Sequence, residues 1–264
     1  MALLACSITN STSREFVEPL ARQLDLPLLQ NPDTASDYQY LLIFENDMLQ
    51  LLPVDKHRGG SLFVDFQSAV AEHRRHTSGI QQDIARAAGC KPGYRPSVLD
   101  ATAGLGNDAF VLAGLGCHIT LLESHPVVYA LLEDGIKRAW QMDTEAGEII
   151  RNYIQLLPRQ DSLPYLAHIV ASTTQSFDVV YLDPMFPERQ KSAKVKKAMQ
   201  YFHDLVGFQP GQEKQLMNLA LQAAGRRVVV KRPRLAPLLD NRKPSYQLKG
   251  KTVRYDIYLT SGRE

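Results

Sequence analysis

A glycine turn between an apolar strand and a helix, at residues 97–108, constrains the fold more than any other stretch of the chain. The apolar run ends at Asp100, the turn contains Gly104 and Gly106, and a helical pattern begins at residue 109. Strand, glycine turn and helix in this order open a nucleotide-binding α/β unit. Glycine lets the backbone approach a ligand where a Cβ atom would clash. We therefore expect a nucleotide-like ligand to bind at this turn.

Predicted strands and helices alternate after this turn. Apolar runs predict four further strands, at residues 118–123, 154–157, 177–183 and 226–231. Apolar spacing predicts two helices, at residues 126–140 and 214–224. The last two candidate strands form a predicted hairpin, at residues 246–249 and 253–260. This order indicates an α/β fold with a Rossmann-like, mostly parallel sheet and a C-terminal antiparallel hairpin, whose ligands bind at the carboxyl ends of the strands.

The beginning of the chain is predicted to form a small N-terminal α/β subdomain and a linker helix. Local patterns predict a helix, a turn and two hairpin strands, at residues 15–24, 31–33, 40–44 and 48–52. A glycine turn at residues 59–60 leads into a strand-like run that ends at Phe66. Prolines and a glycine interrupt the chain at residues 91–96. We therefore predict two domains, residues 1–90 and residues 91–264.

The two ends of the chain carry opposite charge. Residues 1–55 hold two basic and eight acidic side chains, whereas residues 189–264 hold seventeen basic and five acidic ones. Such asymmetry is typical of a surface that faces nucleic acid. A solvated basic face would have the same composition.

Composition also excludes several classes of protein. No apolar run approaches the roughly 18 residues of a membrane span, and the first residues lack the pattern of a signal peptide. The three cysteines, Cys6, Cys90 and Cys117, form no metal-binding or disulfide pattern. We expect a cytoplasmic protein without a metal, a membrane partner or a protein partner.

Acidic residues follow the next two predicted strands, where a nucleotide-like ligand would meet them. Glu123 ends the second strand, 19 residues after Gly104, in the position that binds a ribose diol. Asp161 and Ser162 follow the third strand, where a carboxylate or hydroxyl can bond an adenine amine; alone they would be turn residues. Dinucleotide enzymes share the ribose acid, but their third fingerprint glycine is missing here, which disfavours an NAD-dependent oxidoreductase.

A proline-flanked loop at residues 183–187 follows the fourth predicted strand and carries the sharpest chemical signal. Two prolines stiffen it, which also suits a rigid loop without catalysis. The amine of a nucleobase is a poor nucleophile, because its lone pair is delocalised into the ring. Asp183 can accept one N–H and a backbone carbonyl the other, while Phe186 stacks on the base, worth roughly 1–3 kcal/mol. We predict that Asp183, Pro184 and Phe186 are catalytic.

Basic residues without an acid among them follow this loop, and others lie near the fifth predicted strand. The second group contains Arg226, Arg227, Lys231, Arg232 and Arg234. Each is more often solvated than bound, but their position beside the loop favours contact with an RNA backbone. A predicted helix around residues 73–76 offers a similar choice between a polar face and an RNA contact. The predicted RNA-binding residues are Arg74, Arg75, Arg189, Lys191, Lys194 and Lys197.

The motifs together resemble one known family. Asp-x-x-x-Gly-x-Gly at residues 100–106 resembles the first motif of S-adenosylmethionine (SAM) methyltransferases. Residues 183–187 resemble the Asp/Asn-Pro-Pro-Tyr/Phe loop of amino methyltransferases, with Met185 in place of the second proline. With residues 59–66, 190–193 and 228–233, these motifs look like the bacterial RsmJ family of 16S ribosomal RNA guanine methyltransferases. The resemblance covers residue 55 to the end.

The resemblance implies a SAM-dependent enzyme that methylates the 2-amino group of a guanosine in 16S rRNA, as free RNA or in the small ribosomal subunit. Two alternatives stay open: methylation of the adenine 6-amino group in DNA or RNA, and a non-catalytic SAM-binding RNA assembly factor. The implied cofactor, SAM, would contact Asp100, Gly104, Gly106, Asn107, Asp108, Glu123, Ser124, Asp161, Ser162 and Asp183.

Overall fold

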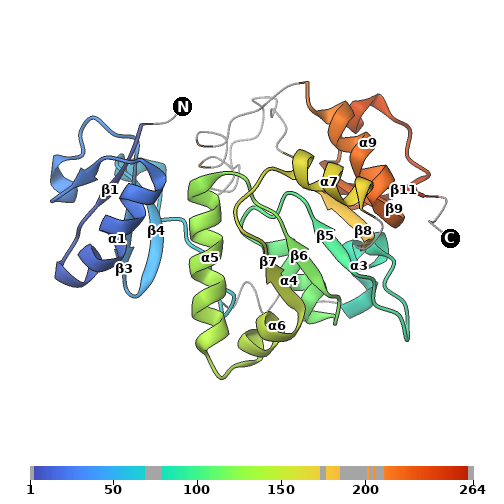
Figure 1. Cartoon of the computed structure of the whole chain (residues 1–264), viewed down its shortest axis with the longest axis horizontal. Helices are drawn as coiled ribbons and strands as arrows, with labels where there is room; N and C mark the ends of the chain where they lie inside the picture. Colours follow the sequence, from blue (N-terminus) through green and yellow to red (C-terminus); the bar gives the residue numbers. More distant parts are fainter. Residues whose placement is uncertain are drawn as a thin grey trace. The chain divides into compact units, whose positions relative to one another are not determined.

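The computed structural model describes residues 3–68, 79–172, 177–184, 201, 205 and 211–260 (Figure 1). The chain divides into two compact units. Unit 1 comprises Met1–Val64, His125–Gly135 and Met185–Phe208, and unit 2 comprises Asp65–Ser124, Ile136–Pro184 and Gln209–Glu264. The predicted domain boundary at residue 90 stays a prediction.

Unit 1 contains a four-stranded sheet in the order β2-β1-β3-β4. Its strands are β1 (Leu4–Ser7), β2 (Leu28–Leu29), β3 (Tyr40–Glu45) and β4 (Met48–Pro53). β1 runs parallel to β2 and β3, and β3 pairs antiparallel with β4, which confirms the predicted hairpin. Asn46 and Asp47 turn the hairpin with φ of 53° and 57°, a conformation that asparagine and aspartate tolerate.

Helix α1 (Ser11–Leu24) begins four residues before the predicted start. Asn10 and Ser13 form a capping box: the Ser13 amide donates to Asn10 Oδ1 at 2.8 Å, and the Asn10 amide donates to Ser13 Oγ at 2.9 Å. Apolar spacing alone does not reveal this first turn. Short 3-10 helices follow at η1 (Pro32–Thr34), where a turn was predicted, and at η2 (Lys56–Arg58).

The predicted strand-like run that ends at Phe66 is not a strand. Leu62 makes an isolated bridge to Leu51, with both backbone hydrogen bonds at 2.8 Å. The side chain of Asp65 then accepts the Gln67 amide at 2.9 Å, which turns the chain and ends the pairing.

Unit 2 contains a seven-stranded sheet in the order β10-β11-β9-β8-β5-β6-β7. Its strands are β5 (Val98–Asp100), β6 (Ile119–Leu121), β7 (Ile154–Leu156), β8 (Phe177–Leu182), β9 (Ala224–Pro233), β10 (Tyr246–Lys249) and β11 (Val253–Leu259). The pairs from β7 through β9 are parallel, and β11 pairs antiparallel with β9 and β10. The predicted parallel sheet with a C-terminal hairpin is therefore confirmed.

Helices connect these strands in the order expected of an α/β fold. They are α3 (Asp83–Ala88), α4 (Asn107–Gly114), α5 (Pro126–Gln141), α6 (Glu145–Tyr153), α7 (Ser162–Ala171) and α9 (Glu213–Ala223), with short 3-10 helices η3 (Gly79–Gln81) and η4 (Leu239–Asn241). The sequence patterns do not predict α6 or α7. In the part of the chain that the structure describes, no helix is long and apolar enough to cross a membrane.

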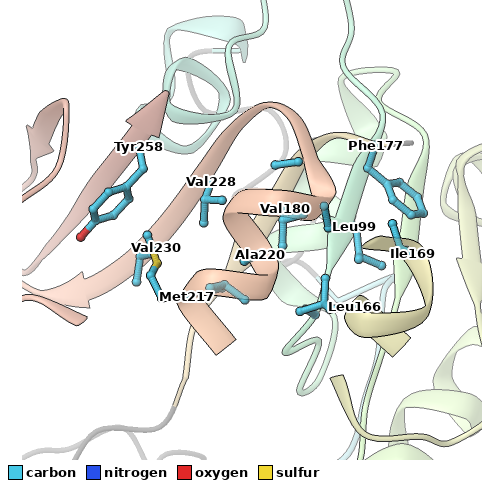
Figure 2. Close-up of a cluster of buried hydrophobic side chains, with 14 of the residues drawn as sticks. Leu99, Leu166, Ile169, Phe177, Val180, Met217, Ala220, Val228, Val230 and Tyr258 are labelled. Carbon is cyan, nitrogen blue, oxygen red and sulfur yellow. The ribbon is translucent and has the colours of Figure 1, made fainter. Parts of the chain in front are cut away.

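One hydrophobic core of unit 2 lies between the sheet and the helices α7 and α9, which pack against each other. Figure 2 shows side chains of β5, β8, β9 and β11 meeting those of the two helices, among them Leu99, Val180, Val228, Leu166 and Met217. Each of these five side chains is at most 1% exposed. The apolar run of β8 is buried as a central parallel strand requires. This core fixes the ends of the strands at which ligands bind.

Candidate functional site

The candidate site lies at the carboxyl ends of β5 and β8, which are neighbours although about 80 residues separate them in the sequence. The chain runs from β5 outward to β6 and β7 and then returns to β8 on the opposite side of β5. Such a reversal of strand order opens a crevice for ligands in α/β sheets. Asp100 ends β5, and Asp183 directly follows β8.

The glycine turn has the geometry that the sequence predicts. Gly104 and Gly106 adopt φ of 55° and 72°, in the left-handed region that favours glycine. Glu123, which follows β6, accepts the Gly104 amide at 2.9 Å through Oε2. Asn107 and Asp108 form the first turn of α4. The predicted ribose acid and the predicted turn are therefore brought into direct contact.

Three more predicted residues lie around the loop after β5. Asp161 caps α7 by accepting the Leu163 amide at 2.7 Å, which is the simple turn role that the sequence left open. The Ser162 hydroxyl donates to the carbonyl of Ala101. The carbonyl of Ser124 accepts a hydrogen bond from Arg159 at 3.2 Å.

Lys231 on β9 joins two of the predicted acids, a position that the sequence does not reveal directly. Its Nζ lies 2.6 Å from Oδ2 of Asp108 and 3.0 Å from Oδ2 of Asp183. The hydroxyl of Tyr181 also donates to Oδ2 of Asp108, at 2.7 Å. The Asp183 amide donates to Thr102 Oγ1 at 2.6 Å, which fixes the start of the loop after β8. In the sequence, Lys231 directly follows the apolar residues 228–230, and a lysine at the end of a buried strand is the pattern that could have indicated this position.

Asp100 and Asp183 both have a raised pKa. Burial raises the pKa of Asp100 to about 8, and the nearby Asp108 and Asp183 add to this shift. Surrounding protein atoms and the charge of Asp108 also raise the pKa of Asp183, while Lys231 opposes the rise. Burial lowers the pKa of Lys231, but Asp108 and Asp183 outweigh it, so the net pKa is raised and the lysine stays charged. The site therefore combines a permanent cation with acids of altered proton affinity.

Several predicted residues lie outside the described residues: Phe186, Arg74, Arg75, Arg189, Lys191, Lys194 and Lys197. Pro184 is described and is partly buried. The proposed roles of these residues therefore rest on the sequence.

The basic group near the fifth strand is not a single cluster, so the prediction that all five residues lie beside the loop after the fourth strand is wrong. Arg226 and Arg227 lie at the beginning of β9, at the opposite edge from Asp183. There Arg226 pairs with Asp178 at 3.0 Å, and Arg227 donates to Tyr246 and the Ala87 carbonyl. A strand of this length spans the sheet, so residues at its amino and carboxyl ends lie at opposite ends of the strands.

Two other members of that group, Lys231 and Arg232, make contacts within the protein. Arg232 is 2% exposed and donates to the carbonyl of Pro237, and Lys231 forms the ion pairs described above. Arg234 is exposed, in the loop after β9 on the edge that holds Asp183. Of the five residues, only Arg234 therefore keeps both the exposure and the position that an RNA contact requires.

The strand order, the glycine turn and the acids at the carboxyl ends of β5, β6 and β8 define a Rossmann-like methyltransferase that uses SAM. A family model described as "Putative SAM-dependent methyltransferase" matches residues 20–260. A relative from Cellvibrio japonicus named ribosomal RNA small subunit methyltransferase J is 46% identical over 262 residues, 97% of this chain and 96% of the relative. A protein of the same name from Tolumonas auensis is 45% identical, over 92% of each chain.

A solved SAM-dependent methyltransferase from Neisseria gonorrhoeae matches the structure with a TM-score of 0.74 and 37% identity, covering 98% of this chain and 97% of that one. The chain belongs to this SAM-dependent methyltransferase family, the family of the proteins named ribosomal RNA small subunit methyltransferase J. The resemblance drawn from the motifs is confirmed. It also extends into the first 55 residues, which the motifs did not cover.

Proposed function

We propose that this enzyme transfers a methyl group from SAM to the exocyclic 2-amino group of a guanosine in 16S ribosomal RNA. The observation that carries the proposal is the position of Asp183 at the carboxyl end of β8, beside the glycine turn and held by Thr102 and Lys231. The names of the relatives support ribosomal RNA of the small subunit as the substrate. A cytoplasmic location agrees with such a substrate.

The residues at the carboxyl edge fit SAM. Bound there, SAM would supply an electrophilic methyl group on a positively charged sulfur. Glu123 is placed to accept hydrogen bonds from the ribose diol, and the amides at the start of α4 suit the methionine carboxylate. Asp161 and Ser162 would lie near the adenine, although Oδ1 of Asp161 already caps α7. A site lined by acids suits a cofactor with a cationic sulfur.

Asp183 would act directly on the acceptor amine. Its carboxylate accepts one N–H, and the carbonyl of Pro184 is a candidate to accept the other. This pulls the nitrogen toward tetrahedral geometry and frees its lone pair for the in-line displacement. Transfer would break the bond between the methyl carbon and the sulfur of SAM, which would leave as a neutral thioether. The amine proton would pass to Asp183, whose raised pKa makes it a stronger base than an ordinary aspartate. Phe186 would hold the base by stacking.

RNA contacts are proposed at Arg74, Arg75, Arg189, Lys191, Lys194 and Lys197. The support is their charge and, for the last four, their position directly after the catalytic loop. Extracting a base costs a few kcal/mol, and nearby phosphate contacts can offset this cost.

The decisive experiment incubates the protein and labelled SAM with small ribosomal subunits from a strain that lacks this gene, followed by nucleoside mass analysis. We expect label in N2-methylguanosine. Label in N6-methyladenosine would support the adenine alternative instead, and absence of turnover would support a non-catalytic assembly factor.

A variant of the catalytic acid tests the mechanism in the same assay. Asp183→Ala should lower turnover by more than the roughly 10²–10³-fold that loss of one stabilising group costs. Asp143→Ala serves as a control, because Asp143 is exposed in the loop between α5 and α6. Near-normal turnover of Asp183→Ala at saturating SAM would overturn the assignment.

A further inference from the structure

Lys231 stands next to Asp183 because of the register of two parallel strands. Leu182 of β8 pairs with Val230 of β9, so the next residue on each strand comes to the same level at the carboxyl edge. The lysine side chain is 22% exposed and reaches Oδ2 of both Asp108 and Asp183. Among the described residues, Oδ1 of Asp183 receives no hydrogen bond.

We propose that Lys231 is a positioning residue for methyl transfer: its ammonium group holds Oδ2 of Asp108 and Asp183 and keeps Asp183 an ionised acceptor, with Oδ1 left for the substrate amine. This inference rests on the proposed function. Because Asp108 lies in the first turn of α4 beside the glycine turn, the same lysine also connects the cofactor side of the site to the acceptor side.

The need for a cation follows from the spacing of the two carboxylates. Both Oδ2 atoms lie within 3.0 Å of one nitrogen. Two carboxylates that share a site cannot both ionise easily without an opposite charge between them. A protonated Asp183 could donate from the oxygen that should accept the amine N–H. Lys231 therefore determines whether Asp183 can perform its role near neutral pH.

Within the residues that the structure describes, the titratable and charged groups around Asp183 belong to five elements. They are Asp108 of α4, Asp100 of β5, Tyr181 of β8, Lys231 and Arg232 of β9, and Tyr255 of β11. Burial raises the pKa of both tyrosines, so they stay neutral and cannot replace the charge of the lysine. Arg232 also lowers the pKa of Asp183 and stays in place when Lys231 is changed.

The test compares Lys231→Met with the parent enzyme and with Lys91→Met, a control at an exposed lysine before β5, on the opposite edge of the sheet. Methyl transfer is measured between pH 6 and 10. An opposite charge close to a carboxylate lowers its pKa by about 1–3 units, so its loss should move the acid limb of kcat upward by about that amount. At pH 7, kcat should fall about 10- to 100-fold, with recovery at high pH and little change in the KM for RNA. Lys231→Arg should move the limb back toward the parent.

A double-mutant cycle provides a second readout. If Lys231 acts through Asp183, adding Lys231→Met to Asp183→Asn should cost little further activity. Thermal unfolding and SAM binding of each variant report whether the protein is folded, and Lys231→Gln, which also removes the charge, carries the pH test if the Met variant does not fold. An unmoved pH profile, or losses that add in the double variant, would overturn the role of Lys231. Failure of the parent to form N2-methylguanosine would instead overturn the proposed function.

Discussion

Glu123 and Gly104 are 19 residues apart in the sequence, and a 2.9 Å hydrogen bond joins them in the structure. The position of Glu123 was predictable, because an acid at the end of the second strand follows from strand order alone. Lys231 was not predictable in the same way. Its ion pairs depend on the register of β8 and β9, and a sequence pattern gives the existence of two strands but not their alignment.

Replacing Glu123 tests the cofactor site at the scale of one residue. Glu123→Ala should weaken SAM binding by roughly 1.5–3 kcal/mol, the range for hydrogen bonds that involve a charged group. Part of the loss would come from the glycine turn, since the Gly104 amide loses its acceptor. Calorimetric titration with SAM measures the effect.

Glu123→Gln is the matched control for this prediction. It keeps an oxygen for the Gly104 amide but removes the charge, so it should fall between the parent and the Ala variant. RNA binding should not change in either variant. Unchanged SAM affinity in Glu123→Ala would exclude Glu123 from the cofactor site.

At the scale of elements, strands that contain long apolar runs were predictable from the sequence, whereas the short amphipathic helices α6 and α7 were not. The β8, β9 and β11 strands come within a few residues of their predicted bounds, because buried parallel strands and a hairpin leave plain patterns. Helices α6 and α7 are short, and each begins at a capping side chain, Thr144 or Asp161. A side-chain cap contributes stability without lengthening the apolar pattern.

Gly147, in the first turn of α6, gives a prediction about packing between helices. A Cβ atom there would lie 2.2 Å from the Met142 carbonyl oxygen and 2.7 Å from that of Ala139. Gly147→Ala should therefore lower the free energy of unfolding by about 1–3 kcal/mol, although alanine favours helices. Urea unfolding measures this. Gly60→Ala, where no atom lies within 4 Å, should change stability by less than about 0.5 kcal/mol; equal stabilities of the two variants would contradict the packing argument.

The basic segment after the catalytic loop gives a prediction about RNA. Replacing Lys191, Lys194 and Lys197 with Gln should weaken RNA binding, because each phosphate contact releases counterions. The dependence of log affinity on log salt should flatten by about 0.7–0.9 per lost contact. Filter binding of ribosomal RNA across a salt series measures both quantities, with SAM affinity as the internal control. Equal slopes for variant and parent would show that these lysines do not touch phosphate.

At the scale of the whole molecule, a mostly parallel sheet with a C-terminal hairpin was predictable, because strands and helices alternate along the sequence of unit 2. The order of the strands within the sheet was not predicted. The division of the chain into two compact units was harder to predict from the sequence. Segments far apart in the sequence join unit 1, including part of α5, and a local sequence pattern does not reveal which distant segments come together. Contacts between distant segments leave no local pattern.

The strand order has a thermodynamic consequence. Residues 100–108, 123, 161–162, 183 and 231 come together only once β5, β6, β7, β8 and β9 have all joined one sheet, so no single stretch of chain carries the proposed cofactor site. Occupancy by SAM is therefore linked to the cooperative folding of unit 2. At a hundredfold excess over its Kd, SAM should add about 2.7 kcal/mol to the free energy of unfolding. Scanning calorimetry should show the melting transition rise with SAM concentration. SAM should protect the whole span from β5 to β9 from proteolysis. Protection confined to the glycine turn would show that SAM binding stabilises this turn alone and would contradict the coupling to the folding of unit 2.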